Sequence, residues 1–304
     1  MKLNLPSPIE KIYLNDRIGE IIVKRDDLIH PFISGNKWRK LKGIIQNFKG
    51  NELITFGGAF SNHLLAVASY ASLYGMKSKG IIRGNELDES NPTLSACVDS
   101  GMKLEFIDRD SYRKRTSEIH NSLLDHTKEQ LFIPEGGTTL FAKIGMQELV
   151  DEIKSQVSNV NVFCSYGTGG TALGIGSALD SEDHLSIVPA IKGLSRESIL
   201  ENQNLLNCSF QNFKIEEYLS MKRYAAKDLD LFEFCEEFLI KHALLLDPIY
   251  TSKVMYFLSN HFTKKNDQEI VFIHTGGIQA WKGYFYRFPN LKTRFKNIYS
   301  EISK

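Results

Sequence analysis

The chain has 304 residues, which is long enough for a large hydrophobic core, and typical domain sizes predict two domains. Its 37 basic and 36 acidic residues nearly balance, so the composition gives no reason to expect nucleic acid or an anionic membrane as a partner. Four cysteines lie far apart without a Cys-x-x-Cys pair, which argues against a zinc site and against a disulfide framework.

The N-terminal half of the chain alternates predicted strands with predicted helices. Residues 20–23 predict a strand. A helix is expected to begin near Asn36, because Gly35 and Asn36 suit a turn or N-cap and apolar residues follow at helical spacing from Trp38. The alternation continues with strands at 53–56, 80–82, 103–107 and 131–133, and with helices at 61–71, 92–100, 111–126 and 140–156.

The C-terminal half repeats this pattern. Residues 160–164 predict a strand, a glycine-rich turn follows, and a helix is expected to run on to residue 179. Later strands are expected at 185–190 and 270–273. Strands separated by helical patterns of roughly 10–15 residues indicate parallel sheets that are covered by helices on both faces. In such sheets, ligands bind at the turns that follow the carboxyl ends of the strands.

Lys37 lies in the first turn of the helix that begins near Asn36. The positive end of the helix dipole is an unfavourable place for an ammonium group, and a Schiff base with an aldehyde cofactor would make the nitrogen neutral. On this segment alone, a solvated lysine within a basic run is the simpler interpretation. The assignment of Lys37 therefore depends on the other motifs.

The glycine-rich turn is the strongest candidate for a ligand site. Bare amides and threonine hydroxyls at a helix N-terminus can form a phosphate cradle. A dinucleotide site would need an acidic residue after the next strand, which ends instead in Ile191-Lys192, and a P-loop would need Gly-Lys-Ser/Thr. The turn therefore predicts a site for one phosphate without a nucleoside, although an ordinary tight turn remains an alternative. The residues of this turn are Gly167, Thr168, Gly169, Gly170 and Thr171.

Two further polar turns follow predicted strands. In the first, Ser61, Asn62 and His63 offer a hydroxyl, an amide and an imidazole at a helix N-terminus, where they can receive a carboxylate and steer protons. Ordinary N-capping by Ser61 or Asn62 is the alternative, and a lone histidine is more often structural than catalytic. The second turn contains Thr275 and two glycines.

A lysine at a helix start, a cradle for one phosphate and polar turns together suggest pyridoxal phosphate. With these motifs the chain resembles the 1-aminocyclopropane-1-carboxylate deaminase/D-cysteine desulfhydrase family, within the tryptophan-synthase-β-like (fold type II) pyridoxal-phosphate enzymes. The resemblance covers nearly the whole chain. It rests on Lys24-Arg25-Asp26-Asp27, Gly35-Asn36-Lys37, Arg39-Lys40-Leu41, Gly57-Gly58, Ser61-Asn62-His63, Ile133-Pro134-Glu135-Gly136-Gly137, the Gly167–Thr171 turn, Asp247-Pro248-Ile249-Tyr250 and His274-Thr275-Gly276-Gly277.

The resemblance implies an α/β fold of two domains, with parallel-rich twisted sheets flanked by helices. We expect a larger cofactor-binding domain of residues 1–48 and 155–304 and a smaller α/β domain of residues 49–154. The active site is expected in the cleft between them.

The resemblance also implies roles for individual residues. Lys37 matches the lysine that binds the cofactor covalently, and residues 167–171 match the phosphate loop. Asn62 matches a residue near the cofactor's 3-hydroxyl and phosphate. Ser61 matches a hydroxyl that contacts the substrate carboxylate or the reacting carbon. The remaining matches are two catalytic tyrosines, Tyr250 and Tyr224, the residue that faces the pyridine nitrogen, Thr251, and two substrate-binding residues, His63 and Thr275.

Thr251 and Thr275 bear on which reaction is expected. Members of the family that open the cyclopropane ring tend to have glutamate and leucine there, whereas two threonines resemble the D-cysteine desulfhydrases. A carboxylate would keep the pyridine nitrogen protonated and make the ring a strong electron sink, whereas a threonine hydroxyl leaves a weaker sink. A weaker sink is adequate when a β-leaving group such as a thiolate carries the electrons away.

The sequence therefore predicts a lyase that converts D-cysteine to pyruvate, sulfide and ammonia. Alternatives are 1-aminocyclopropane-1-carboxylate deamination to 2-oxobutyrate and ammonia, elimination on another D-amino acid such as D-serine, and a binding protein on a decayed enzyme scaffold. The expected cofactor is pyridoxal 5'-phosphate, without a metal, and the expected assembly is a homodimer. The N-terminus lacks the apolar segment of a signal peptide, so we expect a cytoplasmic protein.

Overall fold

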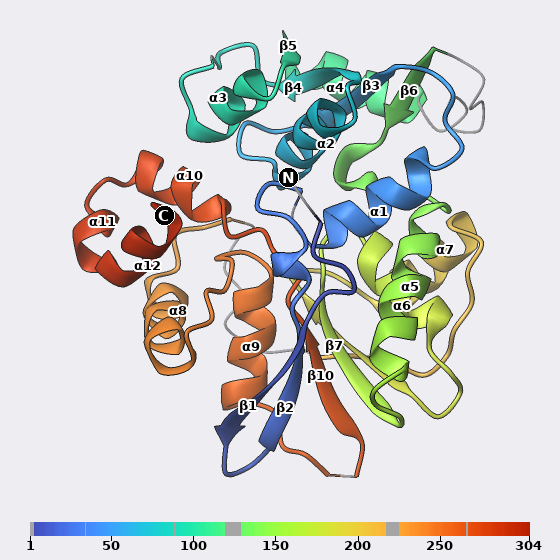
Figure 1. The fold of residues 1–304 in the computed structure, drawn as a ribbon, viewed down its shortest axis with the longest axis vertical. Coiled ribbons are helices and arrows are strands. Elements are labelled where there is room, and N and C mark those ends of the chain that lie inside the picture. The colour runs from blue at the N-terminus through green and yellow to red at the C-terminus, as the bar shows by residue number, and fades with distance from the viewer. Residues whose placement is uncertain (1–2, 34, 88, 119–128, 217–224, 266) are drawn as a thin grey trace.

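The computed structural model describes residues 3–33, 35–87, 89–118, 129–216, 225–265 and 267–304. Within these residues the chain forms two mainly parallel β-sheets with helices packed against them (Figure 1), which confirms the predicted α/β fold class. Of the helix predicted at 111–126, the described part is α4 (Arg109–Glu118). Tyr224 lies outside the described residues.

The larger sheet has six strands in the order β1-β2-β10-β7-β8-β9. Its strands are β1 (Ile9–Asn15), β2 (Gly19–Lys24), β7 (Val160–Tyr166), β8 (His184–Pro189), β9 (Phe213–Ile215) and β10 (Glu269–Ile273). Neighbouring strands are parallel except for β1, which pairs antiparallel with β2 at the edge of the sheet. The sequence did not predict β1 or β9, because β1 is a half-exposed edge strand that contains charged residues and β9 has only three residues.

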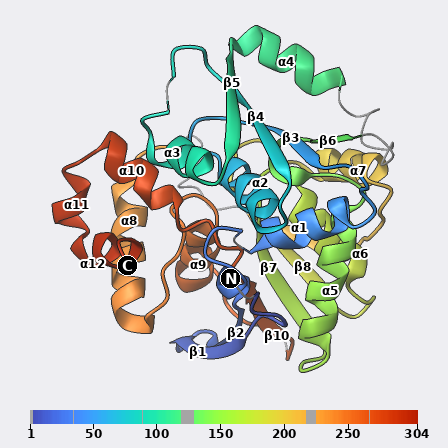
Figure 2. The same ribbon diagram turned by 45° about the horizontal axis from the view of Figure 1, so that its top comes forward.

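The smaller sheet has four parallel strands in the order β5-β4-β3-β6. They are β3 (Glu52–Gly57), β4 (Lys77–Arg83), β5 (Met102–Ile107) and β6 (Gln130–Ile133). Helices α2 (Asn62–Leu73) and α3 (Pro92–Asp99) cover one face, and Tyr112 of α4 packs on the other face against Ile54, Phe56 and Ile81. Figure 2 shows α4 on the opposite side of β4 and β5 from α2 and α3.

Alternating residues of the central strands point into two separate cores on the faces of the larger sheet. In β10, Ile270 and Phe272 belong to one core, and Val271 and Ile273 belong to the other. The first core includes α8 (Leu229–His242), α9 (Thr251–Asn260), α10 (Ala280–Arg287), α11 (Leu291–Arg294) and α12 (Lys296–Ile302). The second includes α5 (Ala142–Lys154), α6 (Gly170–Ala178) and α7 (Arg196–Leu205). Both faces are therefore buried, which explains the continuous apolar runs in these strands.

Helix α1 (Asn36–Ile45) joins the two sheets. Its apolar residues, among them Trp38, Leu41 and Ile44, pack in the core of the smaller sheet with α2. Its other side packs closely against α5. A Cβ at Gly145 of α5 would stand 2.0 Å from the Arg39 carbonyl oxygen, so a glycine is needed there. The apolar residues of α5 in turn pack in the core of the larger sheet. Helix α1 therefore has little freedom to shift relative to either sheet.

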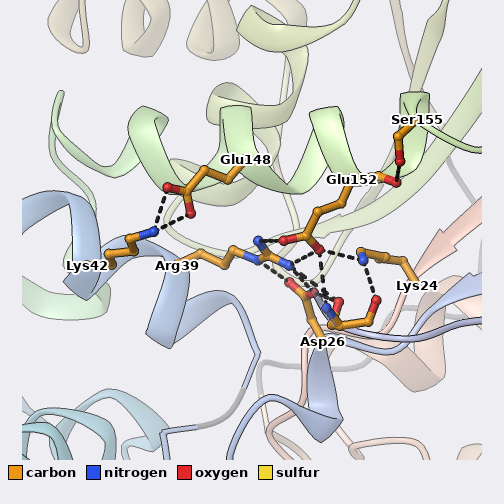
Figure 3. A network of polar contacts seen from close by, with 8 residues as sticks. Lys24, Asp26, Arg39, Lys42, Glu148, Glu152 and Ser155 are labelled. Atoms are coloured by element: carbon orange, nitrogen blue, oxygen red, sulfur yellow. Dashed lines mark hydrogen bonds and ion pairs between the residues drawn. The ribbon is translucent and has the colours of Figure 1, made fainter. Parts of the chain in front are cut away.

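A buried network of charged side chains fixes α1 on this second side (Figure 3). The Arg39 guanidinium donates to both carboxylate oxygens of Asp26, at 2.8 and 3.1 Å, and to both of Glu152 on α5, each at 2.8 Å. Lys24 of β2 forms an ion pair with Glu152 at 2.6 Å and donates to the carbonyl of Ser7. Arg39, Asp26 and Lys24 are almost completely buried, and the two positive charges match the two negative charges.

The strands of the two sheets fall on either side of the predicted domain boundaries. Those of the four-stranded sheet lie within residues 49–154 and those of the six-stranded sheet lie within 1–48 and 155–304. Helix α1, from residues 1–48, packs in the core of the smaller sheet, and α5, from residues 49–154, packs in the core of the larger sheet. The positions of the domain boundaries therefore stay a proposal. Among the described residues, no helix combines the length and the apolar character that crossing a membrane requires.

The buried network predicts a large difference between two neighbouring substitutions on α1. Arg39→Met leaves the buried carboxylate of Asp26 without its ion-pair partner and leaves Glu152 paired with Lys24 alone, so we expect the free energy of unfolding to fall by about 3–5 kcal/mol. Lys42→Met removes a half-exposed pair with Glu148 between the same two helices and should cost less than about 1 kcal/mol. Urea unfolding of both variants at the same pH measures the difference. Equal losses would show that the buried network does not fix α1.

Candidate active site

A pocket of about 290 Å³ lies where strands of both sheets end. Many of its lining residues lie at or just after the carboxyl ends of strands. They are residues 58–63 after β3, 135–136 after β6, Ser165, 167–169 and Thr171 at the end of β7, 275–277 after β10, and Arg83 at the end of β4. The first turns of α1 also line the pocket, as do Tyr250 and residues of α10. The carboxyl ends of parallel strands are the usual ligand position in such sheets, so this pocket is the candidate active site.

The start of α1 is held by the turn that contains Thr275 and by the glycine-rich turn. Gly35 adopts a positive φ of 56°, and a Cβ there would stand 2.0 Å from the Thr275 carbonyl oxygen, so only glycine fits. The Asn36 amide side chain donates to Thr171 Oγ1 at 2.8 Å. These contacts bring the residue that follows, Lys37, to the pocket wall.

Lys37 has a lowered pKa. Burial lowers its pKa from 10.5 to about 8, against the opposing attraction of the Asp247 carboxylate. Neutral amine is therefore present in useful amounts near neutral pH, and a neutral amine is the form that attacks an aldehyde. Burial is the leading cause of this lowered pKa, and the covalent role of Lys37 stays a prediction.

The glycine-rich turn forms a narrow cradle at the N-terminus of α6. Gly169 adopts a φ of 87°, and a Cβ there would lie 2.5 Å from the Tyr166 hydroxyl. A Cβ at Gly167 would lie 2.9 Å from the ring of Tyr250. Thr168 Oγ1 lies 2.7 Å from Thr138 Oγ1. A side chain at either glycine would therefore clash with its neighbours. Because glycine has no side chain, the backbone amides of the turn stay open to an anion.

Lys40 faces the same cradle, although its role was not predicted from the sequence. Its amine donates to the Gly136 carbonyl at 3.1 Å and would lie 3.1 Å from a Cβ at Gly170. Burial, followed by the neighbouring charge of Lys37, lowers the pKa of Lys40 well below its usual value. A phosphate in the cradle would stabilise the charged form of this lysine. The available signal was its position three residues after Lys37, on the same helix face.

Ser61 caps α2, and its neighbours present unsatisfied polar atoms. Ser61 Oγ accepts from the backbone amides of His63 and Leu64 at 3.3 and 3.4 Å. Among the described residues, six buried side-chain polar atoms lack a partner, and three of them belong to residues that line this pocket. These are Asn62 Oδ1, His63 Nδ1 and Gln279 Oε1. Buried polar atoms are rarely left unpaired, so these three indicate a polar ligand.

The tautomer of His63 follows from its neighbours. Thr55 donates its hydroxyl proton to the Ile133 carbonyl, so the contact of 2.9 Å between Thr55 Oγ1 and His63 Nε2 requires a proton on Nε2. Burial, and then the charges of Lys37 and Lys40, lower the pKa of His63 well below 6.5. His63 is therefore neutral, with Nδ1 as an acceptor.

Tyr250 and Thr251 lie at the start of α9 but differ in exposure to the pocket. Tyr250 lines the pocket beside Gly167. Thr251 is buried and does not line it, since its hydroxyl donates to Asp247 Oδ2 at 2.6 Å and accepts from the Asp247 amide at 2.8 Å. This geometry does not favour the predicted contact of Thr251 with a pyridine nitrogen. Thr275 does line the pocket.

The structure thus brings most of the predicted site residues to one pocket. They are Lys37, Ser61, Asn62, His63, Gly167, Thr168, Gly169, Thr171, Tyr250 and Thr275, with Gly170 in the same turn. Residues that line the pocket but were not predicted include Lys40, Arg83, Gln279 and Arg287. In the part of the chain that the structure describes, no group of three His, Cys, Asp or Glu side chains is arranged to hold a metal ion.

Comparison with known proteins places the chain in a family. The sequence model of the family described as "Pyridoxal-phosphate dependent enzyme" matches residues 3–276, so the chain belongs to this family. The cradle for one phosphate, the lysine with a lowered pKa and the unpaired polar atoms fit pyridoxal phosphate, the cofactor of the family. The resemblance read from the motifs and the cofactor expected from it are both confirmed.

The relatives of this chain are named for two activities, 1-aminocyclopropane-1-carboxylate deaminase and D-cysteine desulfhydrase. A putative 1-aminocyclopropane-1-carboxylate deaminase from Thermotoga maritima is 26% identical over 90% of this chain and 94% of its own length. The bifunctional D-cysteine desulfhydrase/1-aminocyclopropane-1-carboxylate deaminase of Arabidopsis thaliana is 28% identical over 90% of this chain and 77% of its own length. The crystal structure of an ACC deaminase homologue has a TM-score of 0.77 at 23% identity, and the superposition covers 96% of this chain and 95% of that chain.

Two glycine substitutions with the same backbone strain test the cradle. Gly169 and Gly193 have φ values of 87° and 85°, but a Cβ at Gly193 would meet nothing within 4 Å. Gly169→Ala should displace amides that bind the phosphate and weaken cofactor binding about tenfold or more, the value of a hydrogen bond to a charged group. Gly193→Ala should leave the dissociation constant unchanged. Titration of cofactor-free protein with pyridoxal phosphate measures both, and equal constants would rule out the cradle.

Proposed function

We propose that the protein catalyses the α,β-elimination of D-cysteine to pyruvate, sulfide and ammonia. The observation that carries this proposal is a threonine at position 275, which lines the pocket with Lys37. Among the described lining residues, Glu135 is the acidic one, and its carboxylate accepts a hydrogen bond from the Tyr112 hydroxyl at 3.0 Å. A site without an acid for the pyridine nitrogen gives the weaker electron sink that suits a substrate with its own leaving group.

Deamination of 1-aminocyclopropane-1-carboxylate to 2-oxobutyrate and ammonia is the second candidate. The name of the Thermotoga relative favours it. Elimination on another D-amino acid, such as D-serine, would use the same residues as the reaction on D-cysteine. The products separate the cyclopropane reaction from elimination on D-cysteine or D-serine, since ring opening gives 2-oxobutyrate whereas these two eliminations give pyruvate.

The residues of the pocket divide into a phosphate-binding side and a substrate-binding side. The 167–171 turn and Lys40 would hold the cofactor's phosphate, and Lys37 would bind its aldehyde carbon. Pyridoxal phosphate, when bound, would supply an electron sink for the electrons left on the substrate α-carbon. Ser61, Asn62 and the N-terminus of α2 would receive the substrate carboxylate, with His63 Nδ1 as an acceptor for a nearby donor.

Lys37 is the better candidate for removal of the α-proton. A base with a pKa of about 8 is well matched to neutral pH. Ser61 already accepts two backbone amides, which leaves its hydroxyl better suited to donate a hydrogen bond to the substrate carboxylate than to act as a base. Tyr250, and Tyr224 by resemblance, would position or protonate the leaving sulfur. Water then hydrolyses the released aminoacrylate, so that D-cysteine and water balance pyruvate, hydrogen sulfide and ammonia.

We also propose that the protein is a homodimer and is located in the cytoplasm. The four cysteines are free thiols and three of them are buried, which fits a reducing compartment.

Two threonine variants test which hydroxyl matters for the chemistry. Thr275→Val removes a hydroxyl from the pocket at nearly constant shape, so we expect kcat for sulfide release from D-cysteine to fall about tenfold or more with an altered cofactor absorbance. Thr251→Val removes the contact with Asp247 and should lower stability while leaving the cofactor spectrum unchanged. The reverse pattern would restore Thr251 as the residue at the pyridine nitrogen.

The wild-type protein should release pyruvate from D-cysteine much faster than 2-oxobutyrate from 1-aminocyclopropane-1-carboxylate. Preference for the cyclopropane substrate would overturn the proposed reaction in favour of the second candidate.

A further inference from the structure

Two arginines on the pocket wall have no role in the proposed elimination of D-cysteine. Arg83 ends β4 and Arg287 ends α10, and both side chains are exposed to solvent at the pocket. They flank the same loop, which leads to Ser61. Arg83 Nη2 would lie 3.4 Å from a Cβ at Gly58, and the Arg287 guanidinium lies 5.0 Å from the ring centre of Phe60. The two guanidiniums therefore approach the substrate-binding side of the pocket.

An aromatic ring packs against each guanidinium. Arg83 lies over the Tyr112 ring at 5.6 Å, and Arg287 lies over the Tyr284 ring at 4.7 Å and donates to the Gly283 carbonyl. Within the described ranges of the chain, neither arginine forms an ion pair with a carboxylate. Stacking on a ring orients a guanidinium while leaving N–H donors for a planar anion.

The anionic groups of the cofactor and of D-cysteine do not account for these two arginines. Four lining side chains are basic, Lys37, Lys40, Arg83 and Arg287, and Glu135 is the acidic one among the described residues. In the proposed function, the phosphate is matched by Lys40 and the glycine-rich turn, the substrate carboxylate by the N-terminus of α2, and Lys37 reacts. A neutral β-substituent such as a thiol would use neither arginine.

We propose that the pocket selects amino acids whose β-substituent carries a second anionic group, with Arg83 and Arg287 as the specificity-determining residues. This inference rests on the proposed elimination and narrows its substrate class. The chemistry is unchanged: the α-proton is removed, the bond from Cβ to sulfur or oxygen breaks, and its electron pair leaves with the anionic fragment. For S-carboxymethylcysteine, substrate and water balance pyruvate, ammonia and mercaptoacetate, with no oxidant or reductant.

A matched pair of compounds tests the inference. S-Carboxymethylcysteine and S-carbamoylmethylcysteine have nearly the same shape and differ in a carboxylate against a neutral amide, and both enantiomers of each are assayed for pyruvate. With the wild-type holoenzyme we expect kcat/KM to be at least about tenfold higher for the carboxylate, mainly through KM. Equal values for the two compounds would overturn the inference.

Three variants locate the effect. Arg83→Gln and Arg287→Gln should each remove most of the preference for the carboxylate while leaving kcat/KM for the amide within about threefold of the wild type. Arg196→Gln is the control, because Arg196 also stacks on a ring, Phe213 at 4.3 Å, but does not line the pocket. Equal losses with both compounds would mean that the arginines bind the common α-carboxylate or support the fold, and would overturn the inference.

A binding measurement separates this inference from the proposed reaction. Titration of each compound against the cofactor absorbance of the holoenzyme reports affinity without turnover. If no compound, D-cysteine included, yields pyruvate, the proposed reaction is wrong. The specificity inference then stands only if the carboxylate still binds at least about tenfold more tightly than the amide, and if Arg83→Gln or Arg287→Gln abolishes that difference.

Discussion

The buried guanidinium of Arg39 is the constraint on which the site depends. It lies between the carboxylates of Asp26 and Glu152, and Lys24 supplies the second positive charge (Figure 3). Removing the guanidinium would destabilise the fold strongly, because the buried carboxylate of Asp26 would be left without its ion-pair partner. The consequence of this network is geometric. The helix that carries Arg39 also carries Lys37 and Lys40, so fixing the guanidinium fixes the two amines that face the pocket.

The opposite side of the same helix joins the core of the smaller sheet. Trp38, Leu41 and Ile44 pack with α2, whose N-terminus brings Ser61, Asn62 and His63 to the pocket. The larger sheet contributes the glycine-rich turn and the turn that contains Thr275. Residues that are distant in the sequence are thus held around one amine by a helix that belongs to both cores. The low pKa of Lys37 follows from this enclosure, since burial is its leading cause.

The parts of this arrangement that could be predicted from the sequence are those with a local cause. Apolar periodicity and glycine punctuation located nearly all the strands of both sheets, and helix-start signals located α1 and α2 within a residue or two. The edge strand β1 was not predicted, because half of it faces solvent and its pairing partner supplies the order. Thr251 was predicted to contact the pyridine nitrogen because it follows the active-site residue Tyr250. In the structure, its hydroxyl instead donates a hydrogen bond to the buried carboxylate of Asp247, four residues earlier.

Residues whose role arises from distant contacts could not be predicted from the sequence. Lys40 is buried because α1 lies against the loops after β6 and β7. Arg83, at the end of β4, and Arg287, at the end of α10, line the same pocket although they are far apart in the sequence. Charged side chains are usually exposed to solvent, so no local sequence pattern distinguishes Lys40, Arg83 and Arg287 from the other lysines and arginines.

We propose that Lys37 binds the cofactor covalently. Lys40 is the alternative, because it is also a buried lysine in the same pocket with a lowered pKa. Borohydride reduction of the purified holoenzyme followed by peptide mapping distinguishes the two, because reduction makes the bond to the lysine permanent. We expect a pyridoxyl label on Lys37 alone, which is lost in Lys37→Ala and kept in Lys40→Met. A label on Lys40, or on any lysine outside the pocket, would contradict this proposal.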